Sequence, residues 1–215
     1  MTSDVTIIDY GVGNLLSVKR AFEYLGGEVA ISSDPAVILS SKRVVLPGVG
    51  AFPNGMKALK RRGLDKIIQQ VGHRDIKLFA ICLGMQLLME EGEEFEKTVG
   101  LGLIPGRVIA IPEYSIQGLK QNVPHIGWNK IEDSTCNQGW TDTVLSDNQP
   151  GDFLYFVHSF MVDPINREHV IADTFYGGRK IPAVVSHKNI VGCQFHPEKS
   201  GQKGLTIMQK FLDSD

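Results

Sequence analysis

One cysteine of the chain stands where a nucleophile could be both exposed and activated. The segment Ala80-Ile81-Cys82-Leu83-Gly84 follows an apolar strand pattern, and a helical pattern begins directly after it. A sharp strand-to-helix turn exposes the residue at its apex, and small residues two positions before and after avoid collisions with neighbouring backbone. The helix N-terminus favours the thiolate, which is the reactive form of cysteine. We therefore predict that Cys82 is a nucleophile; a buried structural cysteine is the alternative.

A second motif, His196-Pro197-Glu198, could supply the base that a cysteine nucleophile needs. Proline keeps the residue before it out of the helical region, so His196 is expected to be extended. Residues two apart in an extended segment point the same way, so Glu198 can orient the His196 ring through a hydrogen bond. Cys82, His196 and Glu198 would then form a catalytic triad.

The remaining cysteines and histidines suggest no further site. Cys193 and His196 have a Cys-x-x-His spacing, but further zinc ligands at matching spacing are missing, so no metal site is predicted. Cys193 is expected to be a strand residue, and Cys136 lies in a polar stretch without an assigned role. Four isolated histidines are expected to be structural or solvated: His73, His125, His169 and His187.

Two glycine-rich segments have different expected roles. Gly48-Val49-Gly50 follows a predicted strand, and its backbone N–H groups could join that of Leu83 in an oxyanion hole for acyl chemistry at Cys82. A plain tight turn is the alternative for this loop. The segment Gly11–Leu16 resembles the start of a dinucleotide fingerprint but has leucine in place of the third glycine, so no nucleotide site is predicted there.

The elements that must position these residues alternate between strands and helices in the first half of the chain. This alternation predicts an α/β fold with a parallel sheet covered on both faces and with its sites at the carboxyl edge. The expected strands are Val5–Ile8, Glu28–Ile31, Arg43–Leu46 and Lys77–Ile81. The expected helices are Asn14–Leu25, one capped by Asp34-Pro35, Asn54–Gln70 and one that begins with Gln86–Glu91.

The pattern changes after Gly100 to shorter strands separated by turn residues, so this half is expected to be largely antiparallel. The expected strands here are Val108–Ile111, Asn129–Ile131, Phe153–Val157, Ala183–Ser186 and Ile190–Phe195, followed by a closing helix at Gly204–Leu212. Without an internal repeat or a clear linker, residues 1–215 are predicted to form a single domain.

Composition limits the classes of function. The formal net charge of −2 gives no general attraction to nucleic acid, and the basic run Lys57–Arg62 is expected to be a solvated helix face. Three scattered cysteines do not suggest a disulfide framework. Neither a signal peptide nor an apolar run long enough to span a bilayer is evident, so a soluble protein of a reducing cytoplasm, not bound to a membrane, is expected.

Together these motifs resemble those of the class I, or triad, glutamine amidotransferases, and among them the glutaminase subunits of imidazole glycerol phosphate synthases. The resemblance extends over nearly the whole chain. Its segments are Ile8–Leu15 (IDYGVGNL), Leu46–Phe52 (LPGVGAF), Ile81–Leu88 (ICLGMQLL), Gly100–Gly106 (GLGLIPG), Val123–Asn129 (VPHIGWN), Tyr155–Phe160 (YFVHSF) and Gln194–Gly201 (QFHPEKSG). It implies a flavodoxin-like α/β fold with a mixed, mostly parallel central sheet flanked by helices and a small antiparallel part.

The resemblance also implies roles for individual residues, with Cys82, His196 and Glu198 matching the family triad. The other implied roles are substrate binding by Gln86, Glu94 and the strand His158-Ser159-Phe160, an oxyanion hole from Gly48, Val49 and Gly50 with Leu83, and a partner interface with Lys199, Asn14 and Trp128. The sequence departs from the family pattern at Ala80, Phe160, Cys193 and the stretch Glu132–Gly151.

The activity that the resemblance implies is hydrolysis of L-glutamine to L-glutamate and ammonia, without a metal or an organic cofactor. The ammonia would pass to a (β/α)₈-barrel cyclase partner in a heterodimer, which would make imidazole glycerol phosphate and an aminoimidazole carboxamide ribotide in histidine biosynthesis. One alternative is a paralogous subunit that serves amidation of a surface-polysaccharide sugar. A second is a stand-alone thiol hydrolase or peptidase. An inactive docking subunit conflicts with the intact set of Cys82, His196 and Glu198.

Overall fold

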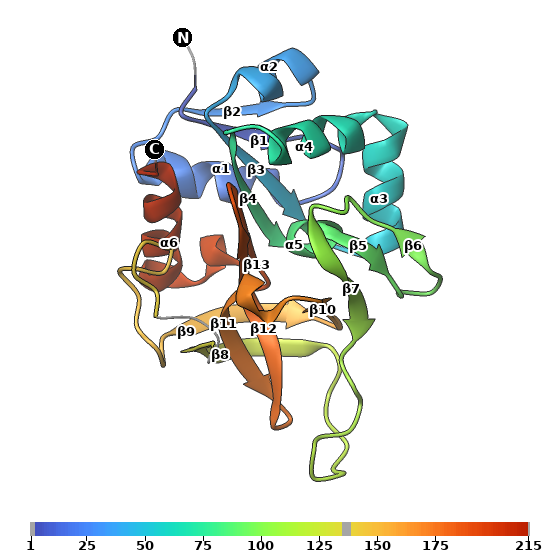
Figure 1. Cartoon of the computed structure of the whole chain (residues 1–215). Coiled ribbons are helices and arrows are strands. Elements are labelled where there is room, and N and C mark those ends of the chain that lie inside the picture. Colours follow the sequence, from blue (N-terminus) through green and yellow to red (C-terminus); the bar gives the residue numbers. More distant parts are fainter. Residues whose placement is uncertain (1–2, 135–138, 215) are drawn as a thin grey trace.

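The computed structural model describes residues 3–134 and 139–214, and a nine-stranded mixed sheet runs through the molecule (Figure 1). Its first five strands in spatial order are parallel: β2 (Val29–Ser32), β1 (Val5–Ile8), β3 (Arg43–Gly48), β4 (Lys77–Cys82) and β13 (Ile190–Cys193). Four antiparallel strands continue the sheet: β12 (Arg179–His187), β11 (Val170–Tyr176), β8 (His125–Asp133) and β9 (Phe153–His158).

A smaller four-stranded sheet lies beside the large one. Its order is β10 (Phe160–Pro164), β7 (Ile104–Ala110), β5 (Met89–Gly92) and β6 (Thr98–Val99). The chain leaves the large sheet at the end of β9 and enters the small sheet at β10, with only Ser159 between the two strands. Residues near Ser159 therefore lie where the two sheets meet.

Helices cover both faces of the parallel half of the large sheet, because apolar side chains point to both faces of its strands. Leu78 and Ala80 of β4 belong to one core cluster, whereas Phe79 and Ile81 belong to the other. Successive side chains of a strand point to opposite faces, so both faces must be buried. Figure 1 shows α1 (Leu15–Tyr24) and α6 (Gly201–Leu212) on one side and α3 (Phe52–Arg61) and α4 (Leu64–Gly72) on the other. Each fully buried aliphatic or phenyl side chain contributes about 1.5–3 kcal/mol.

The remaining helices are short. They are α2 (Pro35–Ser40), α5 (Leu83–Leu87) and the 3₁₀ turns η1 (Arg167–His169) and η2 (Pro197–Lys199). Asp34 caps α2 as expected, because its carboxylate accepts a hydrogen bond from the N–H of Ala36 at 2.8 Å. No helix in the part of the chain that the structure describes is long and apolar enough to cross a membrane.

The predicted α/β fold with parallel strands before the antiparallel ones is confirmed, but two expected helices are wrong in extent. The helix expected over Asn54–Gln70 is two helices, because Gly63 adopts φ +68° and ends the first one. The helix expected over Gln86–Glu91 is also wrong, because α5 ends at Leu87 and Met89–Gly92 pairs with β7 as a strand. Strands β6, β10 and β11 were also not predicted.

The described part of the stretch Glu132–Gly151 contributes to the core on the side of α6. Trp140 is buried and donates a hydrogen bond from Nε1 to the carbonyl of Ile171 at 3.0 Å. Val144 and Leu145 are buried in the same cluster as Phe211. This departure from the family pattern therefore has a packing role, while Cys136 lies outside the described residues.

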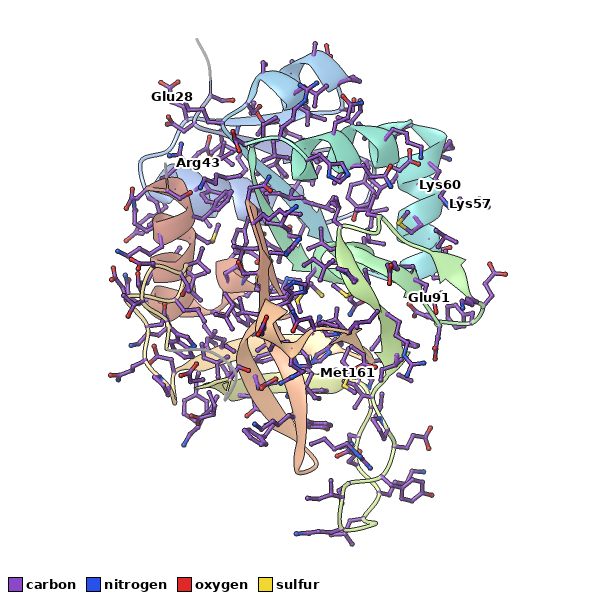
Figure 2. The ribbon with its side chains drawn as sticks, viewed as in Figure 1. Glu28, Arg43, Lys57, Lys60, Glu91 and Met161 are labelled. Carbon is purple, nitrogen blue, oxygen red and sulfur yellow. The ribbon has the colours of Figure 1, made fainter. Side chains whose placement is uncertain are left out.

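The charged side chains of the basic run Lys57–Arg62 lie on the surface side of α3 and at its end. Lys57, Lys60, Arg61 and Arg62 are exposed, and Figure 2 shows Lys57 and Lys60 on the side of the helix away from the sheet. Arg62 donates a hydrogen bond to the carbonyl of Asp9 at 2.8 Å. The run is thus a solvated face of an amphipathic helix whose opposite side is packed in the core.

Candidate active site

Cys82 occupies the apex of the sharp turn between β4 and α5. Its backbone has φ +55° and ψ −112°, a conformation that a non-glycine residue adopts only when the surrounding structure holds it there. A Cβ atom added at Gly84 would overlap the carbonyl oxygen of Leu46, a backbone atom of β3. The glycine two positions after the cysteine is therefore required by the close approach of β3.

The strands on either side of β4 bring the other motifs to the same edge. At the end of β3, Gly48 is paired with Cys82 of β4. At the end of β13, Cys193 is paired with Ile81 of β4. All three strands are parallel, so their following loops emerge together at the carboxyl edge of the sheet. Topology thus places the loop Gly48–Gly50 on one side of Cys82 and His196 on the other.

His196 is buried between Cys82 and Glu198. Its backbone is extended, as predicted, and its Nδ1 lies 2.9 Å from Oε1 of Glu198, which leaves Nε2 for Cys82. Burial by itself lowers the pKa of His196, but hydrogen bonds with Cys82 and Glu198 and the charges of both outweigh this effect and raise the pKa to about 9. The imidazole therefore keeps its proton at neutral pH when it faces the cysteine.

A cavity of about 390 Å³ opens beside Cys82, within the range of small-molecule sites. Most of the predicted site residues line it: Val49, Gly50, Cys82, Leu83, Gln86, Glu94, His158, Ser159, Phe160 and His196. Ala51, Pro124 and Val157 complete the lining. Two predicted residues stand behind the wall: Glu198 behind the His196 ring, and Gly48 against Tyr10, whose hydroxyl donates to the carbonyl of Pro47 at 2.8 Å.

The two predicted substrate-binding side chains on the floor of the cavity are already held by neighbours. Gln86 donates from Nε2 to the carbonyl of Phe160 at 3.2 Å and to Oε1 of Gln194 at 3.0 Å. Glu94 accepts a hydrogen bond from the N–H of Phe52 at 2.7 Å, so its carboxylate sits at the positive N-terminus of α3. Both contacts restrict the side chains to one orientation.

His158 belongs to a chain of hydrogen bonds whose direction can be deduced. The carbonyl of Phe160 can only accept, so Nδ1 of His158 donates to it at 2.8 Å and Nε2 is an acceptor. Nδ1 of His125 lies 3.0 Å from that Nε2 and donates to it, and Nε2 of His125 accepts from Asn129 at 3.3 Å. Burial lowers the pKa of both histidines to about 4, so both are neutral at pH 7.

The residues predicted to face a partner lie on elements around η2. Lys199 is exposed at the end of η2, which packs against both α1 and β9. Asn14 is half-buried at the start of α1. Trp128 is 55% exposed on β8, and its ring meets that of Tyr155 edge-on with centroids 6.1 Å apart. Contact of these three side chains with a partner stays a prediction.

Sequence reasoning missed Gln194, a fully buried residue whose carboxamide contacts both Gln86 and Cys82. A usable signal was present, because Gln194 precedes His196 by two residues and an extended segment points both the same way. Tyr10 was also missed, and nothing in its local pattern distinguishes it from an ordinary buried aromatic residue. His125 was expected to be structural or solvated; it is buried and connected to the cavity through His158.

Comparison with known proteins agrees with this arrangement of elements and side chains. A family model described as glutamine amidotransferase class-I matches residues 6–214. The chain belongs to this family.

Its relatives define the group within the family. Imidazole glycerol phosphate synthase subunit HisH 1 of Legionella pneumophila (strain Lens) is 46% identical over 210 residues, which cover 98% of this chain and 99% of the relative. The HisH subunit of Lactococcus lactis subsp. lactis (strain IL1403) is 44% identical over 209 residues, 97% of this chain and 98% of the relative. At these identities the chain is a member of the HisH group.

Among solved structures, one described as a glutamine amidotransferase superposes with a TM-score of 0.71 over 97% of each chain. Only 18% of the residues are identical, so this likeness concerns the fold alone. It agrees with the class I glutamine amidotransferase fold expected from the sequence.

Proposed function

We propose that this chain is the glutamine-hydrolysing subunit of an imidazole glycerol phosphate synthase, with Cys82, His196 and Glu198 as its catalytic triad. The observation that carries the proposal is the meeting of these three side chains at the wall of one cavity, where Glu198 holds His196 and His196 faces Cys82. The HisH membership of the chain supports the choice of synthase.

In the first half of the reaction, the proton of the Cys82 thiol is carried by His196 as an imidazolium, and the Cys82 thiolate attacks the side-chain amide carbon of glutamine. In this proposal the N–H groups of Leu83 and Val49, two residues that line the cavity beside Cys82, donate hydrogen bonds to the developing oxyanion. His196 then protonates the departing nitrogen, which leaves as ammonia. A glutamyl thioester on Cys82 remains.

In the second half, His196 removes a proton from water, and the resulting hydroxide attacks the thioester carbon. The tetrahedral intermediate uses the same oxyanion hole and collapses with release of L-glutamate. Cys82 leaves as the thiolate beside the protonated His196, and the pair is restored. One glutamine and one water give one glutamate and one ammonia.

The substrate is held by groups whose geometry suits the ends of glutamine. The Glu94 carboxylate lines the cavity and would pair with the α-ammonium group. The Gln86 amide uses its N–H groups on Phe160 and Gln194, so its oxygen is the atom left to accept from the substrate. The segment His158-Ser159-Phe160, where the chain crosses from β9 to β10, lines the same cavity and offers backbone groups along which glutamine would lie.

The partner in this proposal is a (β/α)₈-barrel cyclase that forms a heterodimer with this chain and uses the ammonia in histidine biosynthesis. Lys199, Asn14 and Trp128 form part of the interface in this proposal, which is supported by the exposure of Lys199 and Trp128 and by the packing of α1 against η2. The whole chain acts as one domain in the cytoplasm. No metal or organic cofactor takes part in the proposed steps.

The alternatives predict different behaviour in one experiment. Purified chain, combined with the cyclase subunit encoded in the same genome, is assayed for glutamate release from glutamine and for peptide cleavage. We expect glutamate release that Cys82→Ala abolishes, while Cys193→Val, a buried cysteine outside the cavity lining, retains it. Residual hydrolysis by Cys82→Ala within about tenfold of the parent would contradict the nucleophile. Peptide cleavage without glutamine hydrolysis would favour a stand-alone peptidase.

A further inference from the structure

Gln194 places an uncharged polar side chain in the fully buried wall behind the candidate nucleophile. It is 0% exposed and directly follows β13. Its backbone N–H donates to the carbonyl of Ala183 at 2.9 Å, which fixes the residue to β12. Burial of an amide is costly unless its polar atoms have partners, so both ends of this side chain need them.

Both ends of the Gln194 carboxamide have a partner in the site. Its Nε2 lies 3.7 Å from the sulfur of Cys82, and its Oε1 lies 3.0 Å from Nε2 of Gln86. The residue therefore bridges the nucleophile and a side chain on the cavity floor. It lies outside the cavity lining, so it acts on the reaction through these two neighbours.

The direction of these hydrogen bonds follows from one carbonyl group. The carbonyl of Phe160 can only accept, so the end of Gln86 that faces it at 3.2 Å is the NH₂ group. The same NH₂ group faces Gln194, which must then present its oxygen there. The other end of Gln194 is consequently its NH₂ group, and it donates toward the sulfur of Cys82.

A donor aimed at a sulfur stabilises the thiolate more than the thiol, because the hydrogen bond is stronger to the charged form. The same carboxamide holds Gln86 with its NH₂ group turned inward, so that the Gln86 oxygen is the atom available to a ligand. A side chain that does both would affect the reactivity of Cys82 and the affinity for glutamine through separate contacts.

We propose that Gln194 is a positioning residue with two functions: its NH₂ group stabilises the Cys82 thiolate, and its oxygen orients the Gln86 amide for glutamine. The proposal rests on the proposed glutaminase function for its second half. The first half concerns only the reactivity of Cys82 and can be measured without turnover.

Two substitutions separate the two contacts. Gln194→Glu keeps an oxygen that can accept from Gln86 but replaces the donor at Cys82 with a carboxylate. Gln194→Met has similar length and removes both contacts without adding charge. Gln69→Glu is the matched control, since Gln69 is half-buried on α4, donates to the carbonyl of Leu101 at 2.9 Å and lies outside the cavity lining.

Two measurements are made on each variant. The first is the rate of Cys82 alkylation by iodoacetamide as a function of pH, monitored by mass spectrometry of the Cys82 peptide. The second is kcat and KM for glutamine in the presence of the cyclase partner. Gln194→Glu is expected to move the alkylation midpoint to higher pH and to slow alkylation at pH 7 about tenfold, with little change in KM. Gln194→Met is expected to raise KM about tenfold and to move the midpoint upward by less than Gln194→Glu.

Circular dichroism and thermal unfolding establish that each variant is folded. If the glutamate at this buried position prevents folding, the neutral Gln194→Met variant decides through its alkylation profile. Alkylation profiles of both Gln194 variants that overlay those of the parent and of Gln69→Glu would overturn the donor role, and an unchanged KM in Gln194→Met would overturn the orienting role. A parent that fails to hydrolyse glutamine with its partner contradicts the proposed function instead, and leaves the alkylation result standing.

Discussion

At the scale of single residues, the chemistry depends on His196 having two partners of different kinds. Glu198 accepts a hydrogen bond from Nδ1 at 2.9 Å, while Cys82 interacts with the other nitrogen. The side chains of His196 and Glu198 are both almost fully buried, so their interaction is little screened by solvent. Glu198 therefore orients and stabilises the imidazolium, whereas His196 carries the proton.

This division of roles predicts the order of two substitutions. His196→Ala removes the group that moves protons and is expected to lower kcat for glutamine hydrolysis by about 100- to 10,000-fold. Glu198→Gln retains His196 and is expected to cost less. Steady-state kinetics at saturating glutamine, with the partner present, would measure both. A larger loss in Glu198→Gln than in His196→Ala would reverse the assigned roles.

The raised pKa of His196 predicts an alkaline limb of the activity profile near pH 9. Because the folded-state pKa lies above the ordinary value, the imidazolium persists at neutral pH and is lost as the pH rises through about 9. The departing ammonia then lacks its proton donor, so kcat/KM should fall. In Glu198→Gln the alkaline limb should move to lower pH, because the negative charge of Glu198 that helps to raise the pKa of His196 is removed. An unmoved limb in that variant would assign the titration to another group.

At the scale of elements, the sequence predicted the order of strands and helices and the elbow at Cys82, because short apolar runs and turn residues report local structure. It did not predict that Met89–Gly92 is a strand, since that segment is extended through pairing with β7, a contact that local pattern does not contain. The predicted helix over Asn54–Gln70 ignored Gly63, whose positive φ divides it. Gln194 precedes His196 by two residues, but its role was missed because its partners Gln86 and Cys82 come from distant segments.

The elbow makes a prediction about stability. An alanine at Gly84 would force its Cβ against the Leu46 carbonyl, and backbone cannot move cheaply, so Gly84→Ala is expected to destabilise the fold by about 1–3 kcal/mol and to displace Cys82. Gly55→Ala is the control, because the nearest atoms to its Cβ would be the ends of the Leu83 and Leu87 side chains, not backbone. Urea unfolding compares the two. Equal stability would show that the close approach of β3 does not constrain the turn.

The paired strands β8 and β9 predict acid sensitivity. His125 and His158 stand opposite each other and have pKa values of about 4, below the ordinary 6.5. Between about pH 6.5 and 4 these two histidines are therefore protonated in the unfolded chain but neutral in the folded chain. The free energy of unfolding should fall as the pH is lowered through this window.

Urea unfolding of the parent and of His125→Gln at pH 7 and pH 5 tests this expectation. The variant lacks one titrating histidine and should lose less unfolding free energy on acidification than the parent. The exposed His73 provides the control, and His73→Gln should behave as the parent does. If the His125 variant and the parent lose the same free energy, the acid sensitivity comes from other groups.

At the scale of the whole molecule, the site is assembled where the parallel half of the large sheet meets the small sheet. The loop Gly48–Gly50 follows β3, Cys82 ends β4, and His196 lies shortly after β13. The segment His158-Ser159-Phe160 lies where the chain crosses from β9 to β10. The fold class and most lining residues followed from the sequence. The convergence of four distant segments on one cavity follows from sheet order, which a single sequence does not specify. The single domain over residues 1–215 stays a proposal.

The assembled site also predicts dependence on the partner. Val49 is 41% exposed, and Gly50 adopts φ +95°, so the peptide between Gly48 and Gly50 can reorient at low cost. One orientation aims the Val49 N–H at the oxyanion, and loss of that donor costs about 100- to 1,000-fold in turnover. Glutamate release should therefore be slow for the isolated chain and rise when the partner and an acceptor analogue are added. An isolated chain as fast as the ligand-loaded complex would refute this gating.

The assignment of Cys82 as the glutamine-directed nucleophile is tested most directly by covalent labelling. The chain in complex with its cyclase partner is treated with a diazoketone analogue of glutamine, and the adduct is located by peptide mass spectrometry. One adduct per chain is expected, on the peptide that contains Cys82, with labelling slowed by excess glutamine and absent in Cys82→Ala. An adduct on another residue, or labelling of Cys82 that glutamine does not slow, would contradict the triad at this cavity.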